Sequence, residues 1–124
     1  MEHPHKHRPG LTHGLRAASV ALQGLRDAWQ HEDAFRQEVA IAVFAIPAAL
    51  LLPAAPLGKV MMIASILLVL IVELLNSALE TAVDHTSLER HPLAKRAKDI
   101  ASAAVFLSIV NVAAVWGLVL FFRA

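Results

Sequence analysis

The sequence predicts an all-α membrane protein, with one amphipathic surface helix followed by three transmembrane helices. Three stretches are long and apolar: residues 39–58 and 100–122 carry no charge, and residues 60–83 are interrupted only by Glu73 and Glu80. A bilayer core requires about 20 apolar residues of helix, so each stretch can span it. Helices are the expected form because an isolated strand would leave backbone groups unpaired in lipid.

Composition excludes several other classes of protein. Of the 124 residues, 57% are hydrophobic and 17% are charged, which is unlike an ordinary soluble domain. A chain of this length forms one domain at most and has nothing left to cover three apolar helices in water. The absence of cysteine rules out disulfides and thiolate metal sites. A net charge of +1 gives no reason to expect nucleic acid as a partner.

The N-terminal region is expected to hold a disordered tail and then the surface helix. Residues 1–10 contain three histidines and two prolines, a composition typical of disorder. Over residues 11–31, apolar side chains from Leu11 to Trp29 recur at spacings of three and four, which predicts one apolar stripe on a helix. Such a helix lies in the membrane interface, where Trp29 and the arginines would anchor it.

The three spans are expected at about residues 36–53, 57–84 and 94–122, and residues 11–124 are expected to form a single membrane domain. Pro53 and Pro56 mark the turn between the first two spans. Nine basic residues precede the first span or lie between the second and third, whereas two lie on the opposite side. This excess predicts that the N-terminus and the loop between the second and third spans are cytoplasmic.

The second span carries a column of acids on one helix face. With about 100° of rotation per residue, Glu73, Glu80 and Asp84 fall within about 40° of one another, with Asn76 and Ser77 beside them. A carboxylate in mid-span costs about 2.5–3.5 kcal/mol and therefore requires compensation. Two interpretations stay open: the acids hydrogen-bond neighbouring helices, or they form a functional site with a metal ion or interfacial water.

Basic residues gather where the third span begins. Lys95 and Arg96 fit the positive-inside signal, whereas Lys98, Asp99 and Ser102 are spaced to project into the bundle at the depth of the acids. Acids beside a lysine suit Mg²⁺ with phosphates, because Mg²⁺ commonly uses one or two carboxylates together with substrate oxygens and water. The chain has no P-loop and no protein-kinase signature, so nucleotide chemistry would need a different kind of site.

Four segments together resemble the prokaryotic, integral-membrane diacylglycerol kinase family. They run in the family's order from residue 24 to residue 116. They are Gly24-Leu25-Arg26-x-Ala28-Trp29, Glu32-x-x-Phe35-Arg36-Gln37-Glu38, Glu73-x-x-Asn76-Ser77-Ala78-Leu79-Glu80-x-x-Val83-Asp84 and Ala97-Lys98-Asp99-x-x-Ser102-Ala103-Ala104-Val105. The third of these is the most specific, because it resembles the family signature at the cytoplasmic end of a second span.

The resemblance implies a single membrane kinase domain, assembled as a homotrimeric helical bundle with active sites shared between subunits, in the bacterial inner membrane. It implies phosphoryl transfer from Mg-ATP to the hydroxyl of 1,2-diacylglycerol, giving phosphatidic acid for phospholipid metabolism. It places the catalytic base at Glu73 and the metal ligands at Glu32 and Glu80. The implied ATP-binding positions are Glu32, Glu80, Glu89, His91, Lys98 and Asp99. The implied lipid-side positions are Arg26, Trp29, Ala34, Phe35, Arg36, Gln37, Glu38, Glu73, Ser102 and Trp116, with Asn76 and Asp84 in supporting places.

Two residues depart from the family pattern, and alternatives to the diacylglycerol kinase activity stay open. Val20 stands where the best-known members carry a tyrosine, and His13 where they carry an arginine, so adenine contacts are not carried over to this helix. Undecaprenol kinases share the signature but usually differ over residues 32–38, which favours diacylglycerol as the acceptor. A small proton- or ion-transporting membrane oligomer could also use the buried acids, although the full kinase-like set argues against it.

Overall fold

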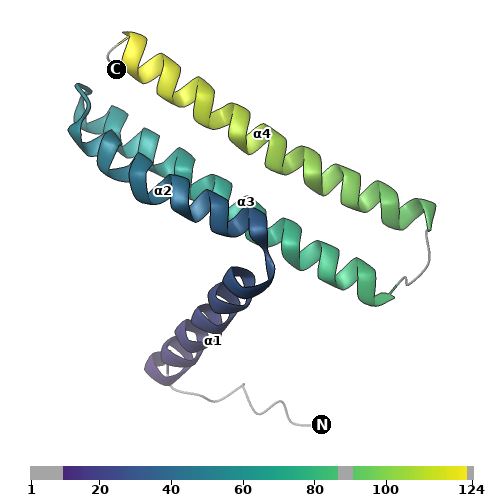
Figure 1. Cartoon of the computed structure of the whole chain (residues 1–124). Helices are drawn as coiled ribbons and strands as arrows, with labels where there is room; N and C mark the ends of the chain where they lie inside the picture. The colour runs from purple at the N-terminus through teal and green to yellow at the C-terminus, as the bar shows by residue number, and fades with distance from the viewer. Residues whose placement is uncertain (1–9, 87–90, 123–124) are drawn as a thin grey trace. The chain divides into compact units, whose positions relative to one another are not determined.

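The computed structural model describes residues 10–86 and 91–122, which form four helices and no strand (Figure 1). In chain order they are α1 Gly10–His31, α2 Asp33–Leu51, α3 Pro56–Thr86 and α4 Pro92–Phe122. By length and composition, α2, α3 and α4 are each able to cross a membrane. The predicted all-α membrane class is therefore confirmed.

Two helix ends, residues 31 and 122, lie where they were expected, and the others differ by one to three residues. The largest difference is in α2, which was expected over 36–53 and begins three residues earlier. Residue 10, expected in the disordered tail, begins α1, and the rest of that tail lies outside the described residues.

Contacts divide the chain into two compact units, Met1–His31 and Glu32–Ala124. In the first unit, α1 is amphipathic, and its stripe residues Leu11, Leu15 and Leu22 are exposed. A stripe of this kind suits a helix that lies in a membrane interface. The extent of the single domain, 11–124, stays a prediction.

Prolines and one lysine shape the turn between α2 and α3. Helix α2 continues through Pro47 and ends at Leu51, and Pro56 then occupies the first position of α3, where its missing N–H costs nothing. Lys59 Nζ donates to Leu50 O over 2.6 Å, so a carbonyl in the last turn of α2 gains a charged partner. The turn is thus tied together by local contacts.

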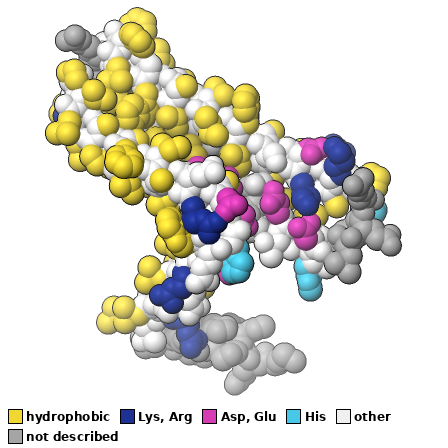
Figure 2. Space-filling view, viewed as in Figure 1, with side chains coloured by type: hydrophobic (Ala, Val, Ile, Leu, Met, Phe, Trp, Pro, Cys, Tyr) yellow, Lys and Arg dark blue, Asp and Glu magenta, His cyan; other side chains and the backbone are white. Residues whose placement is uncertain are grey.

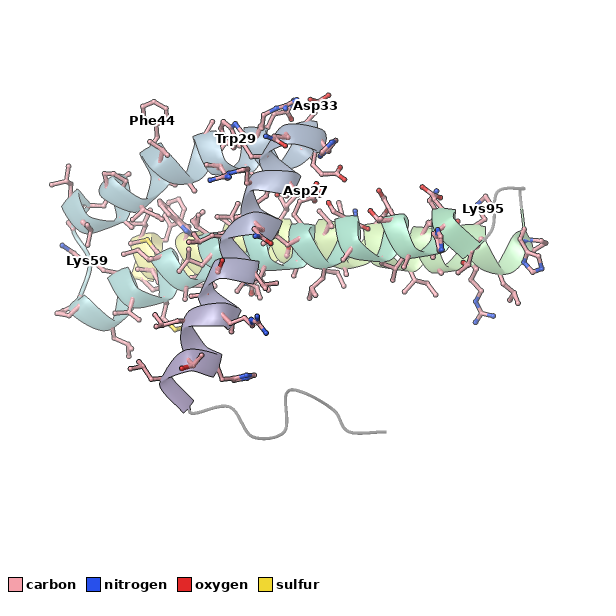
Figure 3. All side chains as sticks on the ribbon, turned by 90° about the horizontal axis from the view of Figure 1, so that it is seen from below. Asp27, Trp29, Asp33, Phe44, Lys59 and Lys95 are labelled. Atoms are coloured by element: carbon pink, nitrogen blue, oxygen red, sulfur yellow. The ribbon has the colours of Figure 1, made fainter. Side chains whose placement is uncertain are left out.

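Helix α3 lies between α2 and α4 and packs against both of them (Figure 1). At the end near this turn, Ala49, Met62 and Val119 form a small core, and Met62 is fully buried. Most large apolar side chains, such as Phe44, instead point outward (Figure 3). In Figure 2 hydrophobic side chains cover this part of the helices, while charged ones gather toward the α3–α4 loop. This distribution matches a surface that faces lipid rather than water.

Candidate active site

Two acids meet where α2 packs against α3. Glu73 on α3 is only 5% exposed, and its carboxyl group interacts directly with that of Glu38 on α2. Glu38 Oε2 is buried and has no hydrogen-bond partner among the described residues. Two buried carboxyl groups repel each other unless a proton or a cation lies between them. The Glu38–Glu73 pair is therefore poorly suited to hold α2 and α3 together, and it is well suited to bind a proton or a cation.

Two further acids lie close enough to act on Glu73 electrostatically. The first is Glu32, which has an extended backbone and directly precedes α2. The second is Glu80, which lies two turns beyond Glu73 on α3. Glu80 Oε1 accepts a hydrogen bond from Asn76 Nδ2 at 3.3 Å, and Asn76 Oδ1 is a buried oxygen with no partner in the described part of the chain. The structure thus brings Glu73 near the two acids that the resemblance gives as metal ligands, and it puts Glu38, an implied lipid-side position, in contact with Glu73.

The donor set fits Mg²⁺ held jointly with a substrate. Within residues 10–86 and 91–122, no three His, Cys, Asp or Glu side chains are arranged to hold a metal by themselves. Mg²⁺ does not need such a cage, because it usually keeps several waters and takes one or two carboxylates plus substrate phosphates. Glu32 and Glu80 can supply the carboxylates, and the Asn76 oxygen, which has no partner within the described residues, is a further polar atom beside Glu80.

Ion pairs connect α3 and α4 at the ends of the two helices that lead into the loop between them. Lys98 Nζ lies 2.9 Å from Asp84 Oδ1, and the same ammonium also interacts electrostatically with Glu80. Lys95 pairs with Asp99 over 2.6 Å along α4. Figure 3 shows Lys95 at the end of the long helices opposite Lys59. Lys98 therefore links α4 to the acidic face of α3, whereas Asp99, which was also expected to project into the bundle, pairs along its own helix.

Other predicted ATP positions have local roles in the structure. His91 Nδ1 accepts a hydrogen bond from Leu93 N at 3.1 Å, and His91 O accepts one from Lys95 N at 3.0 Å, so His91 caps the start of α4. Ser102, a predicted lipid-side position, is exposed on α4 and does not project into the bundle as expected. Glu89 lies outside the described residues.

The predicted lipid-side residues are dispersed. Phe35 is buried, Ala34 and Gln37 are exposed, and Arg36 pairs with Asp33 one turn earlier. Arg26 and Trp29 are exposed on α1 and belong to the other unit.

Trp116 lies far from the acids along the bundle. Its indole Nε1–H contacts Met62 O at 3.2 Å and Ser65 Oγ at 3.1 Å. Met62 precedes Glu73 by eleven residues, which is about 16 Å of helix. The structure therefore joins Trp116 to α3 and does not bring it to the carboxylate cluster.

Sequence reasoning missed an apolar cavity beside the acids. The cavity has a volume of about 170 Å³ and is lined by Glu38 together with apolar side chains of α2, α3 and α4: Ile41, Ile66, Val69, Leu70, Ile109 and Val112. Ile66, Val69 and Leu70 precede Glu73 by seven, four and three residues, so they share its helix face. That spacing was the available signal. The cavity continues the acidic face toward the apolar part of the bundle.

Comparison with known proteins agrees with this geometry. The family model for prokaryotic diacylglycerol kinase matches residues 19–120. The chain is 47% identical over 113 residues to a diacylglycerol kinase of Haemophilus influenzae, covering 91% of this chain and 96% of that protein. It is 47% identical over 117 residues to one of Pseudomonas aeruginosa, covering 94% and 95%. It is 42% identical over 111 residues to one of Escherichia coli, covering 90% and 91%. Because the match extends from α1 through all three spans, the chain belongs to the prokaryotic diacylglycerol kinase family.

Proposed function

We propose that the protein is an ATP-dependent diacylglycerol kinase that makes phosphatidic acid in the bacterial inner membrane. Membership of the family supports a lipid alcohol as acceptor and ATP as donor. The observation that carries the proposal is Glu73, a carboxyl group buried in an apolar span with three other acids close to it. Placing such a residue in a membrane span costs free energy, and acids within membrane spans are usually functional.

Glu73 would act as the general base. Its carboxylate accepts the proton of the lipid hydroxyl, whose oxygen forms a bond to the γ-phosphorus of ATP. The bond between that phosphorus and the bridging oxygen of ADP breaks, so the products are phosphatidic acid, ADP and protonated Glu73. Burial suits this task, because a dry carboxylate is not hydrogen-bonded to bulk water and can take the proton of a bound alcohol.

Charge on the phosphates would be offset by two kinds of group. Glu32 and Glu80 would hold Mg²⁺, which supplies neutralisation and orientation of the phosphate oxygens when it is bound. Lys98 would contact the transferring phosphoryl group, as phosphoryl transfer depends mainly on positioning and electrostatics. The remaining nucleotide contacts would come from Glu89, His91 and Asp99.

The lipid would approach from the bilayer side of the acids. Its contacts would come from the lipid-side positions that the resemblance implies, among which Glu38 is the one in direct contact with Glu73. ATP would arrive from the cytoplasm, which requires the predicted orientation with the N-terminus and the α3–α4 loop on that side. The assembly would be a homotrimer with active sites shared between subunits.

A panel of lipid alcohols tests the function. Purified protein in mixed micelles is given Mg²⁺, γ-labelled ATP and, separately, dioleoylglycerol, undecaprenol or ceramide, and the labelled lipid is extracted and counted. We expect label chiefly in phosphatidic acid. Preferential labelling of undecaprenol would assign the same chemistry to another acceptor. No labelled lipid, together with a pH-driven flux in liposomes, would replace the kinase with a transporter.

A further inference from the structure

One ion pair lies beside the candidate metal-binding residue Glu80. Lys98 Nζ donates to Asp84 Oδ1 at 2.9 Å, and the ammonium is also attracted by Glu80. Glu80 and Asp84 are four residues apart, so they occupy the same face of α3. Lys98 thus faces two acids on α3 and is bonded to the one farther from Glu73.

A nearby acid on α4 is already engaged. Asp99 Oδ2 accepts from Lys95 Nζ at 2.6 Å, within one turn of the same helix. If Asp84 were neutralised, Asp99 would remain occupied by Lys95. Glu80 is the acid on α3 that would then attract Lys98.

The hydrogen-bond partner of Glu80 within the described residues is a neutral group, the side-chain amide of Asn76. The contact from Asn76 Nδ2 to Glu80 Oε1 is long, at 3.3 Å, and the amide oxygen of Asn76 has no partner within the described chain. A metal ion can displace such an amide easily, because the contact is long and the neutral amide does not repel the cation. An ammonium bonded to Glu80 would be much harder to displace, since it occupies the same lone pairs and repels the incoming cation.

We propose that Asp84 is a positioning residue that holds Lys98 away from Glu80 and so keeps the Glu80 carboxylate available to Mg²⁺. The proposal rests on the proposed function, in which Glu80 binds the metal, and it extends that function to a residue that touches neither metal nor substrate. Asp84 also leaves Lys98 within reach of the phosphates, because the pair is partly exposed, with 39% of the lysine side chain and 63% of the aspartate side chain accessible. When nucleotide arrives, Lys98 can exchange one anionic partner for another.

The test is a double-mutant cycle read by metal binding instead of turnover. Mn²⁺ serves as the probe, and its binding to the full-length protein in micelles is followed by electron paramagnetic resonance without nucleotide. We expect Asp84→Asn to raise the Mn²⁺ dissociation constant about tenfold, the usual scale for losing a group that orients a metal ligand. Asp84→Glu should restore wild-type binding, because it restores the partner of Lys98.

The second background separates positioning from a general charge effect. In Lys98→Met there is no ammonium to capture Glu80, so adding Asp84→Asn should leave Mn²⁺ binding unchanged. Equal weakening in both backgrounds would show that Asp84 acts on the cation itself and would overturn the proposal. So would no weakening in either background, or a wild-type protein that binds no Mn²⁺.

A matched control removes one acid elsewhere. Asp27→Asn takes an exposed carboxylate from α1 and should change neither Mn²⁺ binding nor turnover.

The Mg²⁺ dependence of lipid phosphorylation gives a second readout. Asp84→Asn should raise the Mg²⁺ concentration needed for half-maximal turnover, with little loss of turnover at saturating Mg²⁺. Failure of the wild type to phosphorylate any lipid alcohol would reject the proposed function. If the wild type phosphorylates lipid but Asp84→Asn changes Mn²⁺ binding equally, or not at all, in the two backgrounds, only the role of Asp84 is rejected.

Discussion

Neutralising Glu73 should abolish activity without weakening the fold. The change is Glu73→Gln, which keeps the shape of the side chain and removes its charge and its basicity. Loss of a general base lowers turnover about 100- to 10,000-fold, because an amide cannot accept the proton of the lipid hydroxyl. The fold should tolerate the change, since the partner in contact with Glu73 is another acid, Glu38, and no cation is paired with it among the described residues.

The effect on stability follows from the burial of Glu73. Glu73 is 5% exposed within an apolar span. An ionised acid in such a place costs about 2.5–3.5 kcal/mol of insertion free energy. An amide avoids the charge but keeps a polar group in the same place, so only part of that cost is recovered. We therefore expect the free energy of unfolding to be unchanged or raised by up to about 2 kcal/mol. A residue that lowers stability and is required for turnover is the pattern expected of a functional site.

Two measurements on the same preparation check this reasoning. Turnover is measured with γ-labelled ATP and dioleoylglycerol, and stability by unfolding in increasing sodium dodecyl sulfate, followed by far-ultraviolet circular dichroism. Asp27→Asn, an acid-to-amide change at an exposed site, is the matched control and should behave as wild type in both. Turnover of Glu73→Gln close to wild type would refute the assignment of the base. If Glu73→Gln is inactive and its free energy of unfolding is clearly lower than that of the wild type, the claim that Glu73 destabilises the fold is refuted.

Three further substitutions test other parts of the site. Glu80→Gln should raise the Mg²⁺ concentration needed for half-maximal turnover, because one carboxylate ligand is lost; an unchanged Mg²⁺ titration contradicts the metal role. Lys98→Met should raise the KM for ATP about tenfold or more, the scale of a hydrogen bond to a charged group, with a smaller change in the KM for lipid; the reverse ranking contradicts the phosphate contact. Trp116→Phe removes the indole N–H that contacts Met62 O and Ser65 Oγ, so it should lower the free energy of unfolding by about 0.6–1.7 kcal/mol. A large rise in the KM for lipid in this variant, with unchanged stability, would instead assign Trp116 to substrate binding.

The helices and the acidic face of α3 were predictable because both depend on local properties. Hydropathy over about 20 residues marks a span, and the helical repeat alone places Glu73, Glu80 and Asp84 on one face. Helix ends were less accurate: α2 begins three residues before its expected start, where charged Asp33 joins the first turn. Charge at a span boundary hides such an extension, since the polar residues continue the helix but not the apolar pattern.

Contacts between helices were beyond what the sequence alone could predict. Glu38 was placed among lipid contacts by resemblance, yet nothing in the spacing indicated that its carboxyl group meets Glu73, thirty-five residues later. Trp116 was placed on the lipid side by resemblance, and nothing in the spacing indicated that its indole N–H contacts α3. Such contacts depend on how two helices cross and on their relative depth, which a periodic apolar pattern leaves undetermined because several registers bury similar side chains.

The sequence by itself determined that this chain is a membrane protein of helices, with an acidic column toward the C-terminal end of the second span, because lipid requires every segment separately to be long enough and to satisfy its own backbone hydrogen bonds. Only the tertiary structure decided which acids face each other and which acid forms the ion pair with Lys98. Carboxylates four residues apart on α3 are equivalent in sequence, and it is the packing of α4 against α3 that brings the ammonium to 2.9 Å from Asp84 and leaves Glu80 to its amide partner.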